Sequence, residues 1–369
     1  MMSVWSSLVG QDAAVAKLSE AAASARAIVA SRGSGRASDE ARSMSHAWLI
    51  TGPPGSGRSV AARAFAAALQ CTGETVGCGQ CAGCRTTMGR TNADVVFAAT
   101  ETSIINVETA RSLVLQAQSS PSQGLWRVIV VEDADRLGES GANALLKAIE
   151  EPPEHTVWLL CAPSPEDMIA TIRSRCRHLG LRIPTATAVA DLLVREGVAT
   201  PEVALEAARA AQSHIGLARA LARDPQMRER RRAIITAPAS VRSVGEAVMA
   251  ADRLLETAKA QADAQVSERN AREKAELMRQ LGMDEGESAT KASRTMIRQL
   301  EEDQKRRSKR ALTDAIDRAL IDLLAIYRDV LMVQVGGDGE LINTDLADLV
   351  SQIARDSTPR QTLARVDHI

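Results

Sequence analysis

The chain has 369 residues, a formal net charge of −1 and 45% hydrophobic residues, an ordinary composition for a soluble globular protein of two or three domains. A net charge this close to zero provides no overall attraction to nucleic acid or to a membrane. The sequence has no apolar run of bilayer length, and its N-terminus lacks the basic start and apolar core of a signal peptide, so we expect a cytoplasmic protein with no membrane partner.

The first informative stretch lies at residues 46–70. Residues 31–45 are small and polar and predict a loop, after which a short apolar strand leads into a glycine-rich segment and an alanine-rich helix. This order is the one that a phosphate-binding loop requires, because the glycines let backbone N–H groups face a phosphate at a helix N-terminus. The spacing matches that motif except that Arg58 stands where the motif has lysine. The candidate nucleotide-binding residues here are Gly52, Pro53, Pro54, Gly55, Ser56, Gly57, Arg58 and Ser59.

Four cysteines follow this helix within fourteen residues, at Cys71, Cys78, Cys81 and Cys84. Two C-x-x-C steps share Cys81, and four thiolates in a glycine-rich segment suit a structural, tetrahedral zinc ion. A redox pair, unliganded thiols and an iron–sulfur cluster are the alternatives. Cys161 and Cys176 lie in or beside predicted strands, and we interpret them as small buried hydrophobic residues.

The segment from 94 to 183 alternates strands with helices. Apolar strands are predicted at 94–97, 127–131, 157–160 and 179–183, with helices at 107–118, capped by Asn106, and at 140–151. The β-α-β order predicts a parallel sheet covered by helices on both faces. Glu132 and Asp133 directly follow the strand at 127–131, where carboxylates can hold Mg²⁺ and orient a water; the alternative is a solvated turn.

No strand pattern recurs after Pro184, so the rest of the chain is predicted to be helical. Short helices are expected within 189–223, and the segment 259–310 carries dense alternating charge that predicts a long solvated helix or helix pair. Residues 305–310 are locally basic and leave nucleic-acid binding open, although no aromatic residues are interleaved. An apolar stripe from Leu312 to Leu331 is predicted to pack on a helix of its own domain or of a neighbouring subunit.

Five motifs together resemble a known family. They are LVGQ at 8–11, HAWLITGPPGSGRS at 46–59, the four-cysteine segment at 71–84, ANALLKAIEEPPE at 142–154 and SRCR at 174–177. In these motifs the chain resembles the delta-prime subunits of the bacterial DNA polymerase III clamp loader, which are AAA+ proteins, and it is similar also to the gamma/tau subunits. The resemblance covers residues 1 to about 225; the region after 240 matches only in position and helical character.

The resemblance implies an α/β architecture followed by an all-α one. Residues 1–183 would form a RecA-like AAA+ core with a zinc knuckle at 71–84, residues 184–240 a helical lid, and residues 241–369 a helical collar that oligomerises. The family helps to load a ring-shaped sliding clamp onto primer–template DNA, driven by ATP in the gamma/tau subunits. The implied partners are gamma/tau and delta subunits, with the clamp and DNA reached through the complex.

Several residues depart from the pattern of the ATP-hydrolysing family members. Those members have lysine at the position of Arg58 and the order Asp-Glu where this chain has Glu132-Asp133. They have a polar residue soon after the strand at 157–160, where this chain has Ala162-Pro163. Arg219 matches the arginine of the family's lid and is retained. We therefore expect the loop to bind ATP and Mg²⁺ weakly or without hydrolysis.

Arg175, in the intact SRC motif, matches the arginine that the family inserts into a neighbouring subunit's ATP site. Such an arginine finger stabilises charge on the transferred phosphoryl group. The sequence therefore predicts a delta-prime-type clamp-loader subunit with no polymerase site of its own and no effective ATPase. The alternatives are an ATP-hydrolysing gamma/tau-type motor, and a zinc-bearing scaffold or nucleic-acid-binding protein that uses no nucleotide.

Overall fold

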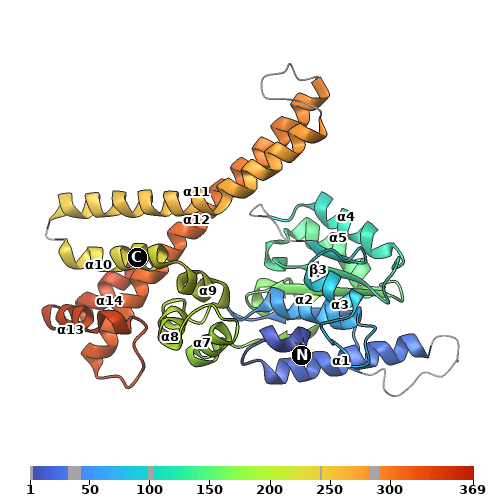
Figure 1. The fold of residues 1–369 in the computed structure, drawn as a ribbon, viewed down its shortest axis with the longest axis horizontal. Coiled ribbons are helices and arrows are strands. Elements are labelled where there is room, and N and C mark those ends of the chain that lie inside the picture. Colours follow the sequence, from blue (N-terminus) through green and yellow to red (C-terminus); the bar gives the residue numbers. More distant parts are fainter. Residues whose placement is uncertain (1–2, 32–42, 99–103, 242, 282–290) are drawn as a thin grey trace. The chain divides into compact units, whose positions relative to one another are not determined.

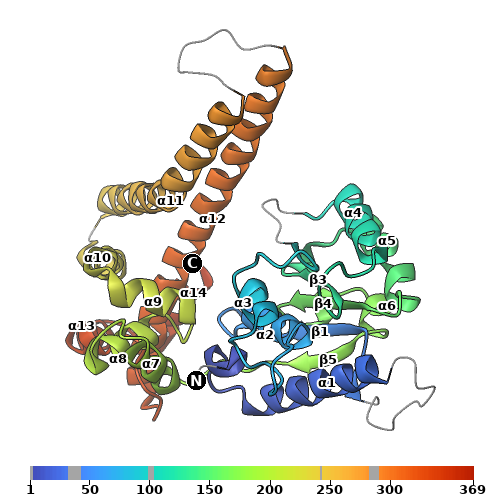
Figure 2. The same ribbon diagram turned by 45° about the vertical axis from the view of Figure 1, so that its right-hand side comes forward.

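The computed structural model describes residues 3–31, 43–98, 104–241, 243–281 and 291–369 (Figures 1 and 2). Most of the loop predicted at 31–45 lies outside these residues. The chain forms two compact units, Met1–Arg219 and Ala220–Ile369, and each is described by itself. The division into core, lid and collar that the resemblance implies stays a prediction, with residues 184–219 of the expected lid falling in the first unit. In the described parts of the chain, none of the helices is sufficiently long and apolar to span a bilayer.

The first unit is built on a five-stranded parallel sheet with the order β2-β3-β4-β1-β5. This sheet confirms the α/β class predicted from the alternation of strands and helices. Because parallel strands end at the same edge, the segments that follow β1, β3 and β4 meet there. The strands are β1 (Ala47–Thr51), β2 (Val95–Ala98), β3 (Arg127–Val131), β4 (Thr156–Ala162) and β5 (Arg177–Gly180).

Helices cover both faces of this sheet, as the sequence predicts (Figure 2). Successive residues of β1 point to opposite faces, so Trp48 and Ile50 enter one core while Ala47 and Leu49 enter the other. The first core lies under η1 (Val4–Ser7), α1 (Asp12–Ala30), α2 (Arg58–Leu69) and α3 (Ala82–Met88). The second lies under α4 (Val107–Gln118), α5 (Glu139–Glu150) and α6 (Ala170–Arg173).

The remaining short elements complete the first unit. The turns η3 (Ala134–Arg136) and η4 (Pro165–Asp167) follow β3 and β4. After β5 the chain enters the helices α7 (Ala186–Arg195), α8 (Pro201–Ala210) and α9 (Ile215–Arg223), which are the helices predicted within 189–223; the boundary between the two units falls within α9, after Arg219. The facing sides of α7 and α8 are closely packed, with buried leucine, valine and alanine side chains.

The second unit contains helices joined by loops, and no strand, among its described residues. Its helices α11 (Val244–Gln280) and α12 (Lys291–Val335) run side by side as a two-helix arm in both views, which confirms the helix pair predicted for the charged segment. The base of α12 packs on α10 (Pro225–Ser240), α13 (Ala347–Asp356) and α14 (Pro359–Asp367), and η5 (Thr344–Leu346) precedes α13. Of the stripe predicted from Leu312 to Leu331, Tyr327 is buried in this core beside Ile326 and Val330.

A buried polar network connects the elements at the base of α12. Asp329 is fully buried and accepts hydrogen bonds from the backbone N–H groups of Ile342 (3.0 Å) and Asn343 (2.8 Å). Arg231 of α10 donates to Asn343 Oδ1 (2.7 Å) and to Asp322 Oδ1 (3.1 Å). These bonds satisfy the buried charges and hold α10, α12 and the segment before α13 together.

Asp94 anchors a turn at the edge of the sheet in the first unit. Its fully buried carboxylate accepts hydrogen bonds from the backbone N–H groups of Ser122 (2.6 Å), Gln123 (2.8 Å) and Gly124 (2.6 Å), and from Ser122 Oγ (2.9 Å). Burial by itself raises the pKa of this carboxyl, but the donated hydrogen bonds outweigh burial and lower its pKa below the ordinary value. The turn before β3 is thus held by one ionised side chain.

We predict that Asp94→Asn lowers the free energy of unfolding by about 1–3 kcal/mol at neutral pH, because the amide cannot accept all four hydrogen bonds. Since the folded pKa lies below the unfolded one, the carboxylate stabilises the fold above the unfolded pKa of about 4, and this contribution is lost as pH falls through the folded pKa. Urea unfolding between pH 7 and pH 3 measures both effects. The exposed Asp191→Asn is the control; equal stability of the two variants at pH 7 would contradict the assignment.

Candidate nucleotide and metal sites

The glycine-rich loop lies directly after β1, at the edge where the parallel strands end. Gly55 (φ +88°) and Gly57 (φ +89°) adopt the left-handed backbone region that favours glycine. A Cβ on Gly55 would lie 2.9 Å from the Cα of His214, so the loop also has no room for a side chain at this point. Helix α2 begins at Arg58, so the loop leads into a helix N-terminus as the sequence predicts.

Arg58 turns back onto the loop that precedes it. Its Nη1 donates a hydrogen bond to the backbone carbonyl of Gly52, the first residue of the loop. The guanidinium therefore closes the segment 52–58 on itself, in the position where the resemblance expects a lysine directed at phosphate. Ser56 is 2% exposed, and its Oγ has no hydrogen-bond partner among the described residues.

The acidic residues after β3 lie near this loop. The buried thiol of Cys161, in β4, interacts electrostatically with the acidic residues and with Arg58. Burial raises the pKa of this thiol to about 12, the negative charges of Glu132 and Asp133 raise it further, and the positive charge of Arg58 lowers it. Glu132 Oε1 forms an ion pair with Arg90 Nη2 at 2.5 Å. Burial likewise raises the pKa of Asp135, and the charge of Asp133 raises it further. The structure therefore brings Arg58, Glu132 and Asp133 into one neighbourhood.

No hydroxyl is provided by the last residues of β4, which ends at Ala162. The carbonyl of Pro163 accepts a hydrogen bond from the Gly52 N–H (3.1 Å), which joins the end of β4 to the start of the loop. The next hydroxyl along the chain, Ser164 Oγ, accepts from the Glu166 N–H at 3.1 Å and caps the turn η4. Its geometry is therefore that of a cap.

Arg219 forms an ion pair inside the helical segment of the first unit. Its Nε and Nη2 donate to the two carboxylate oxygens of Glu196, each at 2.9 Å, in a bidentate arrangement that joins α9 to the end of α7. The structure therefore does not place the Arg219 guanidinium in contact with the loop at 52–59. Its predicted role at a nucleotide remains a prediction.

Arg175 lies directly after α6 and its C-cap Ser174. It forms an ion pair with Glu150 at the end of α5, and its Nη1 donates to the carbonyl of Thr171 at 2.8 Å. The side chains of Arg175 and Glu150 are 38% and 41% exposed. The guanidinium is thus held in place at the surface without being buried.

Gln11 supports the loop and was not among the predicted site residues. It is 5% exposed, and its Nε2 donates to the carbonyls of Ser56 (3.3 Å) and Arg182 (2.5 Å). The Arg182 N–H donates to Gln11 Oε1 at 3.2 Å. Gln11 thereby joins the loop to the segment after β5. Gln11 belongs to the LVGQ motif at residues 8–11, but neither composition nor periodicity predicts its hydrogen bonds to Ser56 and Arg182.

The four cysteines of 71–84 converge, as their spacing predicts. Their Sγ atoms all lie within 4.8 Å of one another, with Cys71 and Cys84 buried and Cys78 and Cys81 half-buried. Tetrahedral zinc with Zn–S distances of about 2.3 Å requires sulfurs about 3.8 Å apart, so a small contraction would complete a site. The thiols fit a structural metal ion because all four ligands come from the protein.

Backbone N–H groups around the thiols favour the thiolate form that binds metal. The Cys81 N–H donates to Cys78 Sγ and the Cys84 N–H donates to Cys81 Sγ, both at 3.4 Å. Burial opposes ionisation of Cys81, but hydrogen bonds from the backbone of Cys84 and Thr72 outweigh it and lower its pKa to about 6. Burial raises the pKa of Cys84 above its ordinary value. Such donors to the ligand sulfurs are typical of metal–thiolate sites.

Residues 36–185 match the family described as DNA polymerase III, delta subunit. Over the matched segments the chain is homologous to gamma/tau and delta' subunits of DNA polymerase III. It is 35% identical to the gamma/tau subunit of Mycobacterium tuberculosis over 159 residues, which cover 42% of this chain and 28% of that protein.

A delta' subunit is similar to the same degree. The Pseudomonas aeruginosa protein is 34% identical over 165 residues, covering 44% of this chain and 50% of that protein. The chain thus spans about a quarter to a half of the curated relatives it matches. Among solved structures, that of a DNA polymerase III gamma-subunit-related protein from Thermotoga maritima matches this chain with 18% sequence identity and a TM-score of 0.36. The match covers 74% of this chain and 94% of that one.

We predict that the purified protein contains about one zinc ion per chain and that a strong chelator lowers its melting temperature, because the four thiolates stabilise the segment 71–84 only when bridged by metal. Metal analysis and thermal unfolding with and without chelator measure this. Cys81→Ser should reduce the zinc content, whereas Cys176→Ser, outside the cluster, should retain it. A metal-free protein whose stability is insensitive to chelator would show that the thiols are unliganded.

Proposed function

We propose that this chain is a delta-prime-type subunit of the DNA polymerase III clamp loader. In this role it supports ATP-driven loading of a sliding clamp onto primer–template DNA, together with gamma/tau and delta subunits. It provides Arg175 to the ATP site of a neighbouring subunit. Its own glycine-rich loop binds nucleotide weakly or without hydrolysis, and its four cysteines hold a structural zinc ion.

The observation that carries the proposal is the hydrogen bond from Arg58 to the Gly52 carbonyl. The group that would have to reach the β- and γ-phosphates instead closes the loop on itself. Glu132 is paired with Arg90, Ala162 offers no hydroxyl, and Arg219 is paired with Glu196. Hydrolysis requires reacting groups to be held in a narrow range of positions, so these four arrangements argue against turnover at this loop.

The surroundings of Arg175 support its proposed action in the ATP site of a neighbouring subunit. A finger acting in another subunit must be exposed and ordered, and Arg175 is both, because it is 38% exposed and held by Glu150 and the Thr171 carbonyl. An exposed ion pair contributes only about 0–1 kcal/mol, so exchange of Glu150 for a phosphate costs little. A guanidinium suits this exchange because it binds carboxylate and phosphate in similar bidentate geometry.

A second candidate is an ATP-hydrolysing motor of the gamma/tau type. The similarity to gamma/tau subunits favours it, since the 35% identity to the Mycobacterium tuberculosis gamma/tau subunit is about the same as the 34% identity to the Pseudomonas aeruginosa delta' subunit. The two candidates differ in what the isolated chain does with ATP. The state of the glycine-rich loop favours the delta-prime role.

We predict that Arg175→Ala lowers the ATPase rate of a reconstituted clamp loader by at least about tenfold, because the transferred phosphoryl group loses a stabilising charge. The assay contains the partner subunits, the sliding clamp and primer–template DNA. Arg173→Ala is the matched control, since Arg173 is an exposed arginine of the same segment whose Nη1 donates to the Pro165 carbonyl. If Arg175→Ala left both the ATPase rate and clamp loading unchanged, the assignment of Arg175 as an arginine finger would be refuted.

For the chain's own loop, we predict that the isolated protein does not hydrolyse ATP at a measurable rate and that Arg58→Lys strengthens ATP binding several-fold without restoring turnover. Lysine releases the Gly52 carbonyl and presents a compact charge to phosphate, while the order Glu132-Asp133 is unchanged. Calorimetric titration with ATP and ADP, and a phosphate-release assay, measure these effects. ATP hydrolysis by the chain alone, abolished by Arg58→Ala, would instead support the gamma/tau type.

A further inference from the structure

One face of α11 has a continuous apolar stripe that is covered in its second part and exposed in its first. The stripe repeats at spacings of four, three, four, three, four and four residues, which is the seam of a coiled-coil helix. Its members are Val244, Val248, Ala251, Leu255, Ala258, Ala262 and Val266. A sustained seam of this kind indicates that helices pack along its whole length.

The second part of the stripe packs against α12. Ala258 is 1% exposed, Ala262 is 2% exposed and Val266 is 8% exposed, and the last two share a cluster with Ala311 of α12. Further along, Arg307 of α12 donates to Asn270 Oδ1 at 2.7 Å and binds Glu273 at 2.8 Å. These contacts establish a helix-packing interface that follows the seam.

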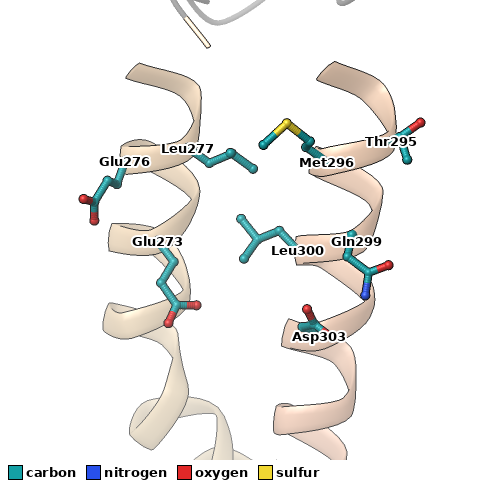
Figure 3. Close-up of a pocket in the computed structure, with 8 residues that line it drawn as sticks. All are labelled: Glu273, Glu276, Leu277, Thr295, Met296, Gln299, Leu300 and Asp303. Carbon is teal, nitrogen blue, oxygen red and sulfur yellow. The ribbon is translucent and has the colours of Figure 1, made fainter. Parts of the chain in front are cut away.

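The interface continues toward the far end of the arm. There Leu277 of α11 faces Met296 and Leu300 of α12 across the space between the helices, and these residues line a cavity of about 570 Å³ (Figure 3). Leu277 lies on the same side of α11 as the stripe, so one face of this helix is used from Ala258 to Leu277. The packing partner throughout this part is α12.

The first part of the stripe has no such cover. Val244, Val248 and Leu255 are 81%, 64% and 48% exposed, and Ala251 is also exposed. In Figures 1 and 2 this part of α11 lies away from α12, beside α10. The exposed residues span about 17 Å of helix at 1.5 Å per residue. Because they continue an interface already formed, they have the right spacing to receive another helix.

The charges beside the exposed stripe are acidic. Asp252 and Glu256 lie on one flank of it, exposed, and neither forms an ion pair with a residue that the structure describes. The next charge on this flank, Lys259, lies where the stripe is already buried. A second copy of α11 packed antiparallel would bring this acidic flank against itself, which is unfavourable. A helix with basic residues beside its apolar seam would complement it.

We propose that the exposed stripe of α11, residues 244–255, is the docking surface for an amphipathic helix of a partner protein, with apolar residues at coiled-coil spacing and lysine or arginine beside them. The docked helix continues the α11–α12 packing beyond the point where α12 leaves the seam. This surface is separate from the glycine-rich loop, the cysteine cluster and Arg175, and the inference does not rest on the proposed function.

The test uses the full-length chain and synthetic helical peptides of about four heptads with leucine at the seam positions. One peptide has lysine at the flanking positions and the other has glutamate. We expect the lysine peptide to bind, with an affinity at least about tenfold higher than that of the glutamate peptide, in fluorescence anisotropy measurements at low salt. Equal affinity of the two peptides, or no binding of the lysine peptide, would overturn the proposal.

Two substitutions locate the binding surface. Val248→Glu and Leu255→Glu should each weaken binding of the lysine peptide at least about tenfold, because they place a charge in the apolar seam. Met249→Glu is the matched control: Met249 is 58% exposed on the same helix but lies off the stripe, and its variant should bind within about twofold of the unaltered chain.

Circular dichroism shows whether all three variants keep their helix content, and sedimentation shows whether the chain associates with itself. Retained binding by folded Val248→Glu and Leu255→Glu would overturn the assignment of the surface. A dimer of the unaltered chain that is lost in Val248→Glu but kept in Met249→Glu would show that a second copy occupies the stripe, and the proposed partner class would then be wrong.

Discussion

The backbone of Gly52 joins three elements at the edge where the parallel strands end, and the candidate nucleotide site depends on this junction. Its N–H donates to the Pro163 carbonyl after β4, and its carbonyl accepts from Arg58 at the start of α2. A Cβ at this position would lie 2.5 Å from Ser56 Oγ and 2.9 Å from the Leu181 carbonyl. The close approach of β1, β4 and the loop is therefore possible only without a side chain here.

Local patterns were sufficient to predict much of the fold. The alternation of apolar strands and helices predicted the parallel sheet, Asn106 was correctly expected to cap α4, and the spacing of four nearby cysteines predicted that their sulfurs converge. Each of these features depends on neighbours within a short stretch of chain or on a regular period. The docking stripe of α11 shows the limit of periodicity, because the same spacing continues through its buried and exposed parts.

The partners of the charged groups could not be predicted in the same way. Arg90 and Glu132 are 42 residues apart, and Arg175 and Glu150 are 25 residues apart, so their pairing depends on how the strands are ordered in the sheet. Arg58 is different, since its acceptor is only six residues away. A motif lists residue types, but whether a long guanidinium reaches outward or folds back depends on the local backbone, and the sequence pattern is the same in both cases.

The buried network at the base of α12 gives the arm the mechanics of a lever. Arg231, Asp322, Asn343 and Asp329 fix one end of this helix in the core of the second unit, and the helix runs on for 45 residues in all. The free part of the helix, about 31 residues from Asp322 back to Lys291, is about 47 Å long at 1.5 Å per residue, so a tilt of about 5° at the base would move the far end by about 4 Å. A small repacking around the fixed end is thereby converted into a displacement of several ångströms at the far end.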